Sequence, residues 1–354
     1  YVFSTSTAWL DARINDVWQS RLELGHAEDK LKDSDKTSPL SYATNTYRDS
    51  VNWLNTLTLG NGHSILLGLD YLKDKVRSTN LYAVNSRYNK AAFAQYSYQG
   101  TSFGGELGVR HDNNEQFGSE NTYNAAISYL INPDNQLIAS YAEGFKAPTF
   151  NDLYWPNDGW FKGNPDLKPE KSKSYELQWR SQLSPTTQLE ASLYRTDLRD
   201  LIVSTNTTDN VDRARINGFE AALKQELFGW QGELGISLID PRDRKTGRTL
   251  QNRARRTLSL DMDRQLDSIG IGATFTAVSS SYANPANTER LAGYGVLDLR
   301  ASWQATSDLA LDIKLANVLD KDYSRLSYSY NGQFYGYQEM PFTAMLGLTW
   351  TPRL

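Results

Sequence analysis

The chain has 354 residues, and its 41 acidic and 37 basic side chains give a formal charge of −4. It lacks the basic stripe that follows a phosphate backbone, so nucleic acid is excluded as a partner. Because it has no cysteine, a disulfide framework and thiolate metal sites are excluded as well. No run approaches the roughly 18 to 20 apolar residues of a membrane-spanning helix, which excludes a helical membrane protein.

From its first residues the chain alternates apolar and polar side chains. Tyr1–Leu10 has the pattern of the middle of a strand and carries no basic and apolar leader, so we expect a piece of a longer mature protein. Ile65–Tyr71, Leu309–Leu315 and Phe342–Trp350 alternate with period two. This period predicts strands, each with one apolar face.

The other face of these strands carries polar and ionised groups. Glu176, Gln178 and Arg180 alternate with apolar neighbours, as do Asp298 and Arg300. A packed sandwich core would not tolerate a charged second face on so many strands. Two interpretations remain at this point, a soluble sheet with one wet face and a membrane barrel with a wet lumen.

The connections distinguish the two interpretations, because tight and long ones alternate. Tight turns are predicted near Ile14–Val17, Gly60–Gly62, Tyr98–Ser102, Asn132–Asn135, Leu183–Thr187, Phe228–Trp230, Arg264–Asp267 and Ala305–Asp308. Long connections are predicted over Asp33–Thr44, Val76–Ser86, Asp112–Glu120, Lys146–Glu170, Asp240–Leu250, Ser281–Glu289 and Leu319–Glu339, with Asn206–Asn210 a short exception. Short turns on one rim and long loops on the other are typical of outer-membrane barrels.

Strand length and aromatic content agree with a barrel. Many strands reach the roughly 9 to 11 residues of a tilted crossing, and a sheet in lipid must close to satisfy its backbone. The 21 tyrosines and 9 tryptophans suit the two membrane interfaces. We therefore predict one all-β domain over residues 1–354, an antiparallel transmembrane β-barrel in the bacterial outer membrane.

The number of strands indicates that part of the barrel is missing. We count roughly 17 strands in the sequence, whereas bacterial single-chain barrels have an even number. An odd number of strands is therefore expected to precede the chain.

Three segments resemble the late-barrel signature of TonB-dependent receptors: Gly144–Tyr154, Gly163–Glu176 and Asn317–Tyr323. Within this family the chain is similar over nearly its whole length to the cobalamin (vitamin B12) transporters. The segments that carry this similarity are Val51–Ser64, Arg110–Gly118, Ala214–Glu220 and Phe334–Gln338. The resemblance implies a roughly 22-stranded barrel around an N-terminal plug. The plug, its TonB box and about five strands would lie outside this chain.

The resemblance also implies a function. A receptor of this kind binds cobalamin at its extracellular mouth and passes it to the periplasm with energy from TonB, which acts through the plug; we expect a monomer. A ferric-siderophore or haem receptor of the same family is one alternative, and a passive porin is another. An enzyme is not expected, because His26, His63 and His111 have no ligand spacing to one another.

Aromatic and amide side chains near the long connections are the candidate ligand contacts. Tyr335, Tyr337 and Gln338 match the cobalamin transporters residue by residue, and Tyr337 is the best single candidate. The resemblance adds Asn89 and Arg253, which fall on positions similar to ligand-facing barrel residues of the family. The full candidate set is Tyr154, Trp155, Asn89, Arg253, Tyr335, Tyr337 and Gln338. The alternatives are a role as interface anchors for the aromatic residues and as plain lumen lining for Asn89 and Arg253.

The resemblance suggests calcium in the extracellular loops, and no cofactor is otherwise required. Asp29 and Asp33 are similar to acidic residues that bind calcium in this family, and hard cations take carboxylate oxygens. Because Lys30 and Lys32 are interleaved with them, a solvated charged loop is the alternative.

The segments Asp240–Arg248 and Arg253–Arg256 form a basic loop base. Anionic lipopolysaccharide, together with outer-membrane lipid, is a candidate partner there. A plain solvated loop is the alternative.

Overall fold

The computed structural model describes residues 1–34, 41–157, 161–204, 207–330 and 333–352. Regular structure in this part is almost entirely β-strand, and the short helix α1 (Phe150–Tyr154) lies between two strands. Among the described residues, no helix is long and apolar enough to span a membrane. The chain is thus an all-β protein, as its alternating sequence predicts.

Seventeen strands of the described part form one sheet. They are β1 (Val2–Arg13), β2 (Trp18–Ser34), β3 (Ser41–Gly60), β4 (His63–Ser78), β5 (Ser86–Gln99), β6 (Phe103–Asn114), β7 (Gly118–Asn132), β8 (Asn135–Lys146), β9 (Glu170–Ser184), β10 (Thr187–Ser204), β11 (Thr208–Leu227), β12 (Trp230–Asp243), β13 (Arg256–Leu266), β14 (Ile269–Val278), β17 (Tyr294–Thr306), β18 (Leu309–Ala316) and β21 (Thr343–Trp350). Two separate hairpins are β15 (Ser281–Tyr282) with β16 (Arg290–Leu291) and β19 (Ser324–Tyr330) with β20 (Gln333–Gln338). The predicted number of strands is confirmed.

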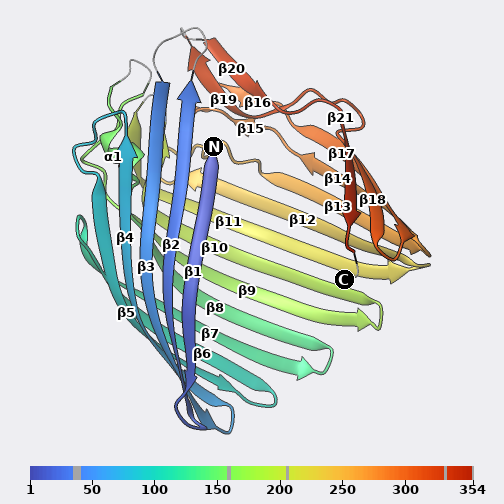
Figure 1. Cartoon of the computed structure of the whole chain (residues 1–354), viewed down its shortest axis with the longest axis horizontal. Coiled ribbons are helices and arrows are strands. Elements are labelled where there is room, and N and C mark those ends of the chain that lie inside the picture. Colours follow the sequence, from blue (N-terminus) through green and yellow to red (C-terminus); the bar gives the residue numbers. More distant parts are fainter. Residues whose placement is uncertain (35–40, 158–160, 205–206, 331–332, 353–354) are drawn as a thin grey trace. The chain divides into compact units, whose positions relative to one another are not determined.

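Strands β1 to β7 pair in chain order, each antiparallel to the next. The same holds for the series β11, β12, β13, β14, β17, β18 and β21. Figure 1 shows this meander as a gradual change of colour from strand to strand. A meander of long strands is the topology of an up-and-down membrane barrel.

The described chain separates into two compact units. Unit 1 contains residues 1–130, 138–175 and 197–213, and unit 2 contains residues 131–137, 176–196 and 214–354. Strands β7, β8, β9, β10 and β11 each contribute residues to both units. The prediction of one barrel domain over residues 1–354 stays a prediction.

The two faces of the sheet differ as the sequence predicts. On β4, Leu67 and Leu69 are exposed apolar residues, and they lie opposite Ala94 and Ala92 of β5. Asp70 and Asp74 point to the other face, because successive side chains of a strand alternate. We call the face with Leu67 and Leu69 the outer face and the face with Asp70 and Asp74 the inner face. An exposed apolar outer face suits contact with lipid.

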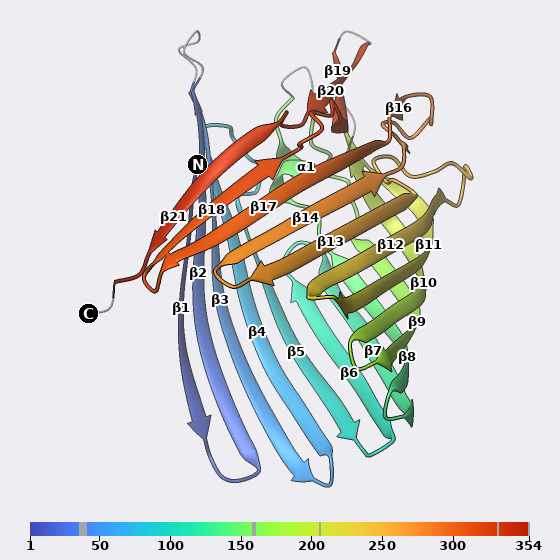
Figure 2. The same ribbon diagram turned by 90° about the vertical axis from the view of Figure 1, so that its right-hand side faces the viewer.

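The short turns depend on residues that accept a positive φ. Between β3 and β4, Gly60, Asn61 and Gly62 all have positive φ, which suits a tight hairpin. A Cβ on Gly62 would lie 2.0 Å from the backbone oxygen of Gln99, so only glycine fits. In unit 1 the turns that join β1 to β2, β3 to β4 and β5 to β6 lie at one end of the strands (Figure 2).

Some predicted long connections are shorter than expected. The one predicted over Asp112–Glu120 is only Glu115–Phe117, because β6 and β7 extend into it. The Asn114 side chain accepts hydrogen bonds from the backbone of Gln116 and Phe117 at 3.1 and 3.2 Å. This Asx turn lets the strands pair almost to the tip. Strand pairing likewise reaches Ser34 and Ser41 in the first predicted loop.

Candidate functional site

The inner face of unit 1 has two adjoining cavities of about 390 and 490 Å³. Both are lined by Arg48, Asp74 and Arg87, from β3, β4 and β5. The start of the connection after β8 also contributes residues to each. The shared part of the wall therefore carries charged groups from several strands, as in pockets that orient a ligand by a few fixed groups.

Ion pairs hold the charged side chains of this wall in place. Arg48 donates two hydrogen bonds to Asp74, at 2.7 and 3.1 Å. Arg110 bridges two carboxylates, donating to Asp70 at 2.5 Å and to Asp112 at 2.9 and 3.1 Å. Bidentate pairs of this kind are rigid, so the wall presents fixed polar groups.

Arg87 links the strand wall to the connection after β8. Its side chain is buried, and its guanidinium donates to the backbone oxygen of Pro148 at 2.9 Å. The same group lies 5.1 Å from the ring centre of Phe150 and 5.6 Å from that of Phe117. Cation–π contacts of this type are strengthened by burial. Arg87 therefore fixes the start of α1 against the cavity.

Asn89 is the predicted ligand residue that lies in this wall. Its Nδ2 donates to Asp112 at 2.8 Å, and the residue lines the first cavity. Its Oδ1 is buried and has no hydrogen-bond partner among the described residues. A buried acceptor without a partner is costly, and a ligand donor would satisfy it.

Tyr154 and Trp155 lie at the end of α1. Thr149 and Asp152 form a capping box at the start of this helix. The Tyr154 hydroxyl accepts a hydrogen bond from Gln116 at 2.5 Å, and the Trp155 backbone accepts one from Gly163 at 3.0 Å. Both residues are thus hydrogen-bonded to neighbouring segments of the chain, and neither of them lines the two cavities.

The family-like segment after α1 is fastened to the start of β11. Leu153 is 0% and Leu167 is 3% exposed, so the loop has its own small core. Asn210 donates to the backbone oxygens of Asp200 and Lys168 at 2.7 and 3.0 Å and accepts from the Lys168 backbone at 2.9 Å. Asn164 donates to the Thr208 backbone at 3.1 Å. These contacts give the motif residues a structural role.

Of the two residues predicted to bind calcium, only Asp29 has a described side chain. Asp29 lines the second cavity and accepts a long hydrogen bond, 3.4 Å, from the Tyr1 hydroxyl. The side chain of Asp33 lies outside the described residues. In the described part, no group of three or more histidine or acidic side chains is placed to hold a metal. The residues in view do not form a calcium site, and calcium stays a prediction.

The remaining candidates belong to unit 2. Tyr335, Tyr337 and Gln338 lie on β20, where both tyrosines are exposed, Tyr337 by 57%. The Tyr335 hydroxyl donates to Gln333 at 2.8 Å. Arg253 lies in the connection between β12 and β13 and forms no ion pair with a described residue. The structure thus brings Asn89, Asp29 and α1 together in unit 1, and the β20 residues together in unit 2.

An ion pair fastens the base of the β19–β20 hairpin. Arg325 donates to both carboxylate oxygens of Glu339, at 2.7 and 2.8 Å. The hydrogen bonds from Arg325 lower the pKa of the Glu339 carboxyl and raise the pKa of Arg325. The hairpin is therefore held at its open end by a charge-assisted contact.

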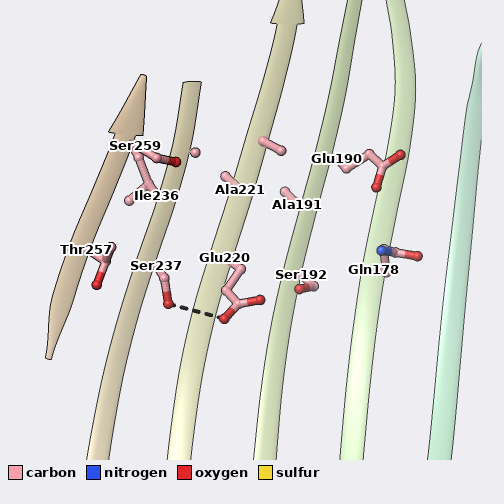
Figure 3. Close-up of a pocket in the computed structure, with 12 residues that line it drawn as sticks. Gln178, Glu190, Ala191, Ser192, Glu220, Ala221, Ile236, Ser237, Thr257 and Ser259 are labelled. Carbon is pink, nitrogen blue, oxygen red and sulfur yellow. Dashed lines mark hydrogen bonds between the residues drawn. The ribbon is translucent and has the colours of Figure 1, made fainter. Parts of the chain in front are cut away.

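Unit 2 has its own cavity of about 380 Å³ on the sheet, lined in part by Gln178, Glu190 and Glu220 (Figure 3). Glu220 accepts from Ser237 at 3.1 Å, marked by the dashed line, and from Tyr194 at 3.2 Å. The sequence predicts Gln178 on the charged face, and the cavity confirms this placement. Short hydroxyls and carboxylates make this stretch hydrophilic.

Sequence reasoning missed the groups that build the unit 1 wall. Arg48, Asp74, Arg87 and Asp112 were not candidates, although each has the strand position of an inner-face residue. The signal was present as ionised groups at alternate positions of β3 to β6. This pattern does not predict which charged side chains meet on the inner face, because that depends on the register between strands.

The chain matches the model of the family described as TonB dependent receptor-like, beta-barrel, over residues 2–318. It belongs to this family of bacterial outer-membrane receptors. It is 33% identical over 299 residues to the vitamin B12 transporter BtuB of Vibrio vulnificus, covering 81% of this chain and 48% of that protein. It is 31% identical over 323 residues to the vitamin B12 transporter BtuB of Photobacterium profundum, covering 87% and 52%. The chain thus spans about half the length of these relatives.

Solved structures share the fold. The siderophore receptor PiuA from Acinetobacter baumannii superposes with a TM-score of 0.78 at 17% identity, covering 98% of this chain and 64% of that one. The ferric yersiniabactin uptake receptor FyuA from Yersinia pestis gives a TM-score of 0.79 at 18% identity, covering 98% and 61%. These relatives and structures are named as transporters and receptors, not as enzymes.

Proposed function

We propose that this chain is the barrel portion of a receptor that binds cobalamin at its extracellular mouth and releases it to the periplasm with energy from TonB. The observation that supports cobalamin as the ligand is the Oδ1 of Asn89, which lies in a polar cavity without a hydrogen-bond partner among the described residues. Cobalamin has amide side groups whose N–H can donate to such an acceptor, and an apolar ring face that suits aromatic contacts. The two similar vitamin B12 transporters support the same ligand.

The energy coupling and the remaining partners belong to the same proposal. TonB would act through a plug domain, and the receptor would work as a monomer. Calcium would bind acidic loops near Asp29 and Asp33. Lipopolysaccharide was predicted at the basic loop base, but Arg242 and Arg255 there both pair with Asp240 at 2.8 Å, which weakens that location.

Equilibrium binding of cobalamin to the full-length receptor in detergent tests the ligand. We expect saturable binding that is weakened roughly tenfold by Asn89→Ala, and weakened further by a calcium chelator. Asn80→Ala is the matched control, since the backbone N–H of Asn80, which the substitution keeps, donates its hydrogen bond to Ser78. Absence of cobalamin binding would overturn the ligand and leave the family assignment intact, with an iron chelate as the next probe.

A conductance measurement separates the receptor from a passive pore. The full-length protein in a planar bilayer should show no steady single-channel conductance, because a plugged lumen blocks ions. Steady open-channel current from the intact protein would favour the porin alternative.

A further inference from the structure

The outer face of β4 and β5 carries a group of cations just beyond its apolar band. Lys73 and Arg77 share the strand face of Leu67 and Leu69, and Lys90 lies opposite Tyr71 on the neighbouring strand. Strands β4 and β5 lie side by side (Figure 1). We call Lys73, Arg77 and Lys90 the outer cation cluster; all three side chains are exposed.

Tyrosines mark the level of this cluster relative to the membrane. The rings of Tyr71 and Tyr88 stack at 6.3 Å, directly after the apolar residues of the outer face. The Lys90 ammonium lies 4.8 Å from the Tyr88 ring centre, and the Arg77 guanidinium lies 5.5 Å from that of Tyr47. Tyrosine collects where hydrocarbon meets the headgroups, so the cluster lies at headgroup level.

The cluster has fewer counter-ions than other cations of unit 1. Lys30 pairs with Glu28 at 2.9 Å and Lys173 pairs with Glu143 at 2.7 Å. Within the described ranges, none of the three cluster side chains forms an ion pair.

Two acids lie close to the cluster and are already engaged. Asp49 lies opposite Lys73 and contacts His26 at 2.7 Å. Glu115 accepts a hydrogen bond from the Tyr88 backbone at 3.0 Å. These two carboxylates are therefore occupied. Lys75, between Lys73 and Arg77 on the same strand face, is a further cation, so the surface keeps a positive excess.

We propose that the outer cation cluster binds the phosphate groups of membrane lipids in the leaflet at the loop end of the barrel. Charge complementarity favours an anionic headgroup, and the tyrosines beside the cations hold the site at the depth of those phosphates. Each basic side chain near a membrane surface adds to the attraction for anionic lipid. The proposal depends on the barrel fold and is independent of the transported ligand.

The test uses the full-length receptor, delipidated in a neutral detergent, with native mass spectrometry to count bound lipid. The probes are bisphosphorylated lipid A, the same lipid without its phosphates, and inorganic phosphate. The variant is Lys73→Gln/Lys90→Gln. The control Lys30→Gln/Lys173→Gln removes the same charge from paired positions, and a heat-modifiability gel shift checks that each barrel is folded.

We expect the cluster variant to lower the affinity for bisphosphorylated lipid A roughly tenfold or more, and the control to change it less than twofold. The dephosphorylated lipid should bind weakly to every form, and millimolar inorganic phosphate should not displace the lipid. Equal affinity of wild type and cluster variant would overturn the proposal. Displacement by inorganic phosphate would overturn it too, because the site would then take free phosphate.

Discussion

Two connections carry the aromatic residues predicted to touch the ligand, and they are built in different ways. The connection between β8 and β9 in unit 1 is fastened by buried side chains and by the amides of Asn164 and Asn210. The β19–β20 hairpin in unit 2 is exposed, and its cross-strand pairing is reinforced by Arg325 and Glu339. The first is thus held by a small buried core, and the second presents its tyrosines on an exposed hairpin.

The largest effect is expected at the core of the fixed connection. Leu153→Ala removes a fully buried side chain and should ease opening of the connection by about 2 to 5 kcal/mol. Hydrogen exchange of the Gly163 and Asn164 amides, which bond to Trp155 and Asp152, measures that opening. Leu326→Ala on the hairpin is the control, because Leu326 is 53% exposed. If both variants increased hydrogen exchange to a similar extent, the proposed difference between the β8–β9 connection and the β19–β20 hairpin would be wrong.

A smaller effect is expected from the amide that fastens this connection to β11. Asn210→Ala loses three hydrogen bonds, which should ease opening by about 1 to 3 kcal/mol. Protease cleavage within residues 161–169, followed by mass spectrometry, measures the change. Gln333→Ala is the matched amide variant on the hairpin, where one exposed bond is lost. Unchanged cleavage of the Asn210 variant would remove its fastening role.

The hairpin should matter more for the ligand than for stability. Tyr337→Ala should weaken cobalamin binding roughly tenfold, as for an aromatic contact residue, and leave the thermal unfolding of the barrel unchanged. Phe334→Ala, another exposed aromatic of β20, is the comparison. If the Tyr337 variant bound cobalamin with unchanged affinity, Tyr337 would not be a ligand contact.

The smallest effect is a pH dependence confined to the hairpin. The pKa of Glu339 is lowered in the folded hairpin. Its ion pair with Arg325 therefore stabilises the hairpin fully at pH values above the ordinary pKa of a glutamate, about 4.3. The contribution is lost as the pH falls through the lowered pKa. The protection factor of the Glu339 amide, which bonds to Tyr323, is the exchange rate corrected for its intrinsic pH dependence. It should fall more between pH 6 and pH 3 in wild type than in Arg325→Gln. Parallel pH profiles would contradict the ion-pair role.

The sequence predicts the barrel well because its signal is local. A period of two and tight turns such as Gly60–Gly62 need only neighbouring residues, so the strand count and the two faces follow directly. The lengths of the connections were less predictable. The Asx turn at Asn114 converts an apparently long loop into a short one, since side-chain capping is hard to foresee from composition alone.

The candidate site was only partly predictable. Asn89 was identified by family resemblance, and the structure adds the reason it could matter, a buried acceptor without a partner among the described residues. Arg48, Arg87 and Asp112 were missed because their meeting depends on register across β3 to β6. Periodicity assigns each residue to a face but cannot tell which neighbours meet there.

The Gly60–Asn61–Gly62 turn limits where this chain can change length during evolution. One residue inserted at this turn would shift the pairing of β3 with β4 and carry Leu67 and Leu69 to the wet face. The connection between β4 and β5, residues 79–85, leaves the register of both strands intact when its length varies. Insertions and deletions should therefore accumulate at the loop end of the strands, so that this end diversifies while the strands themselves keep their register.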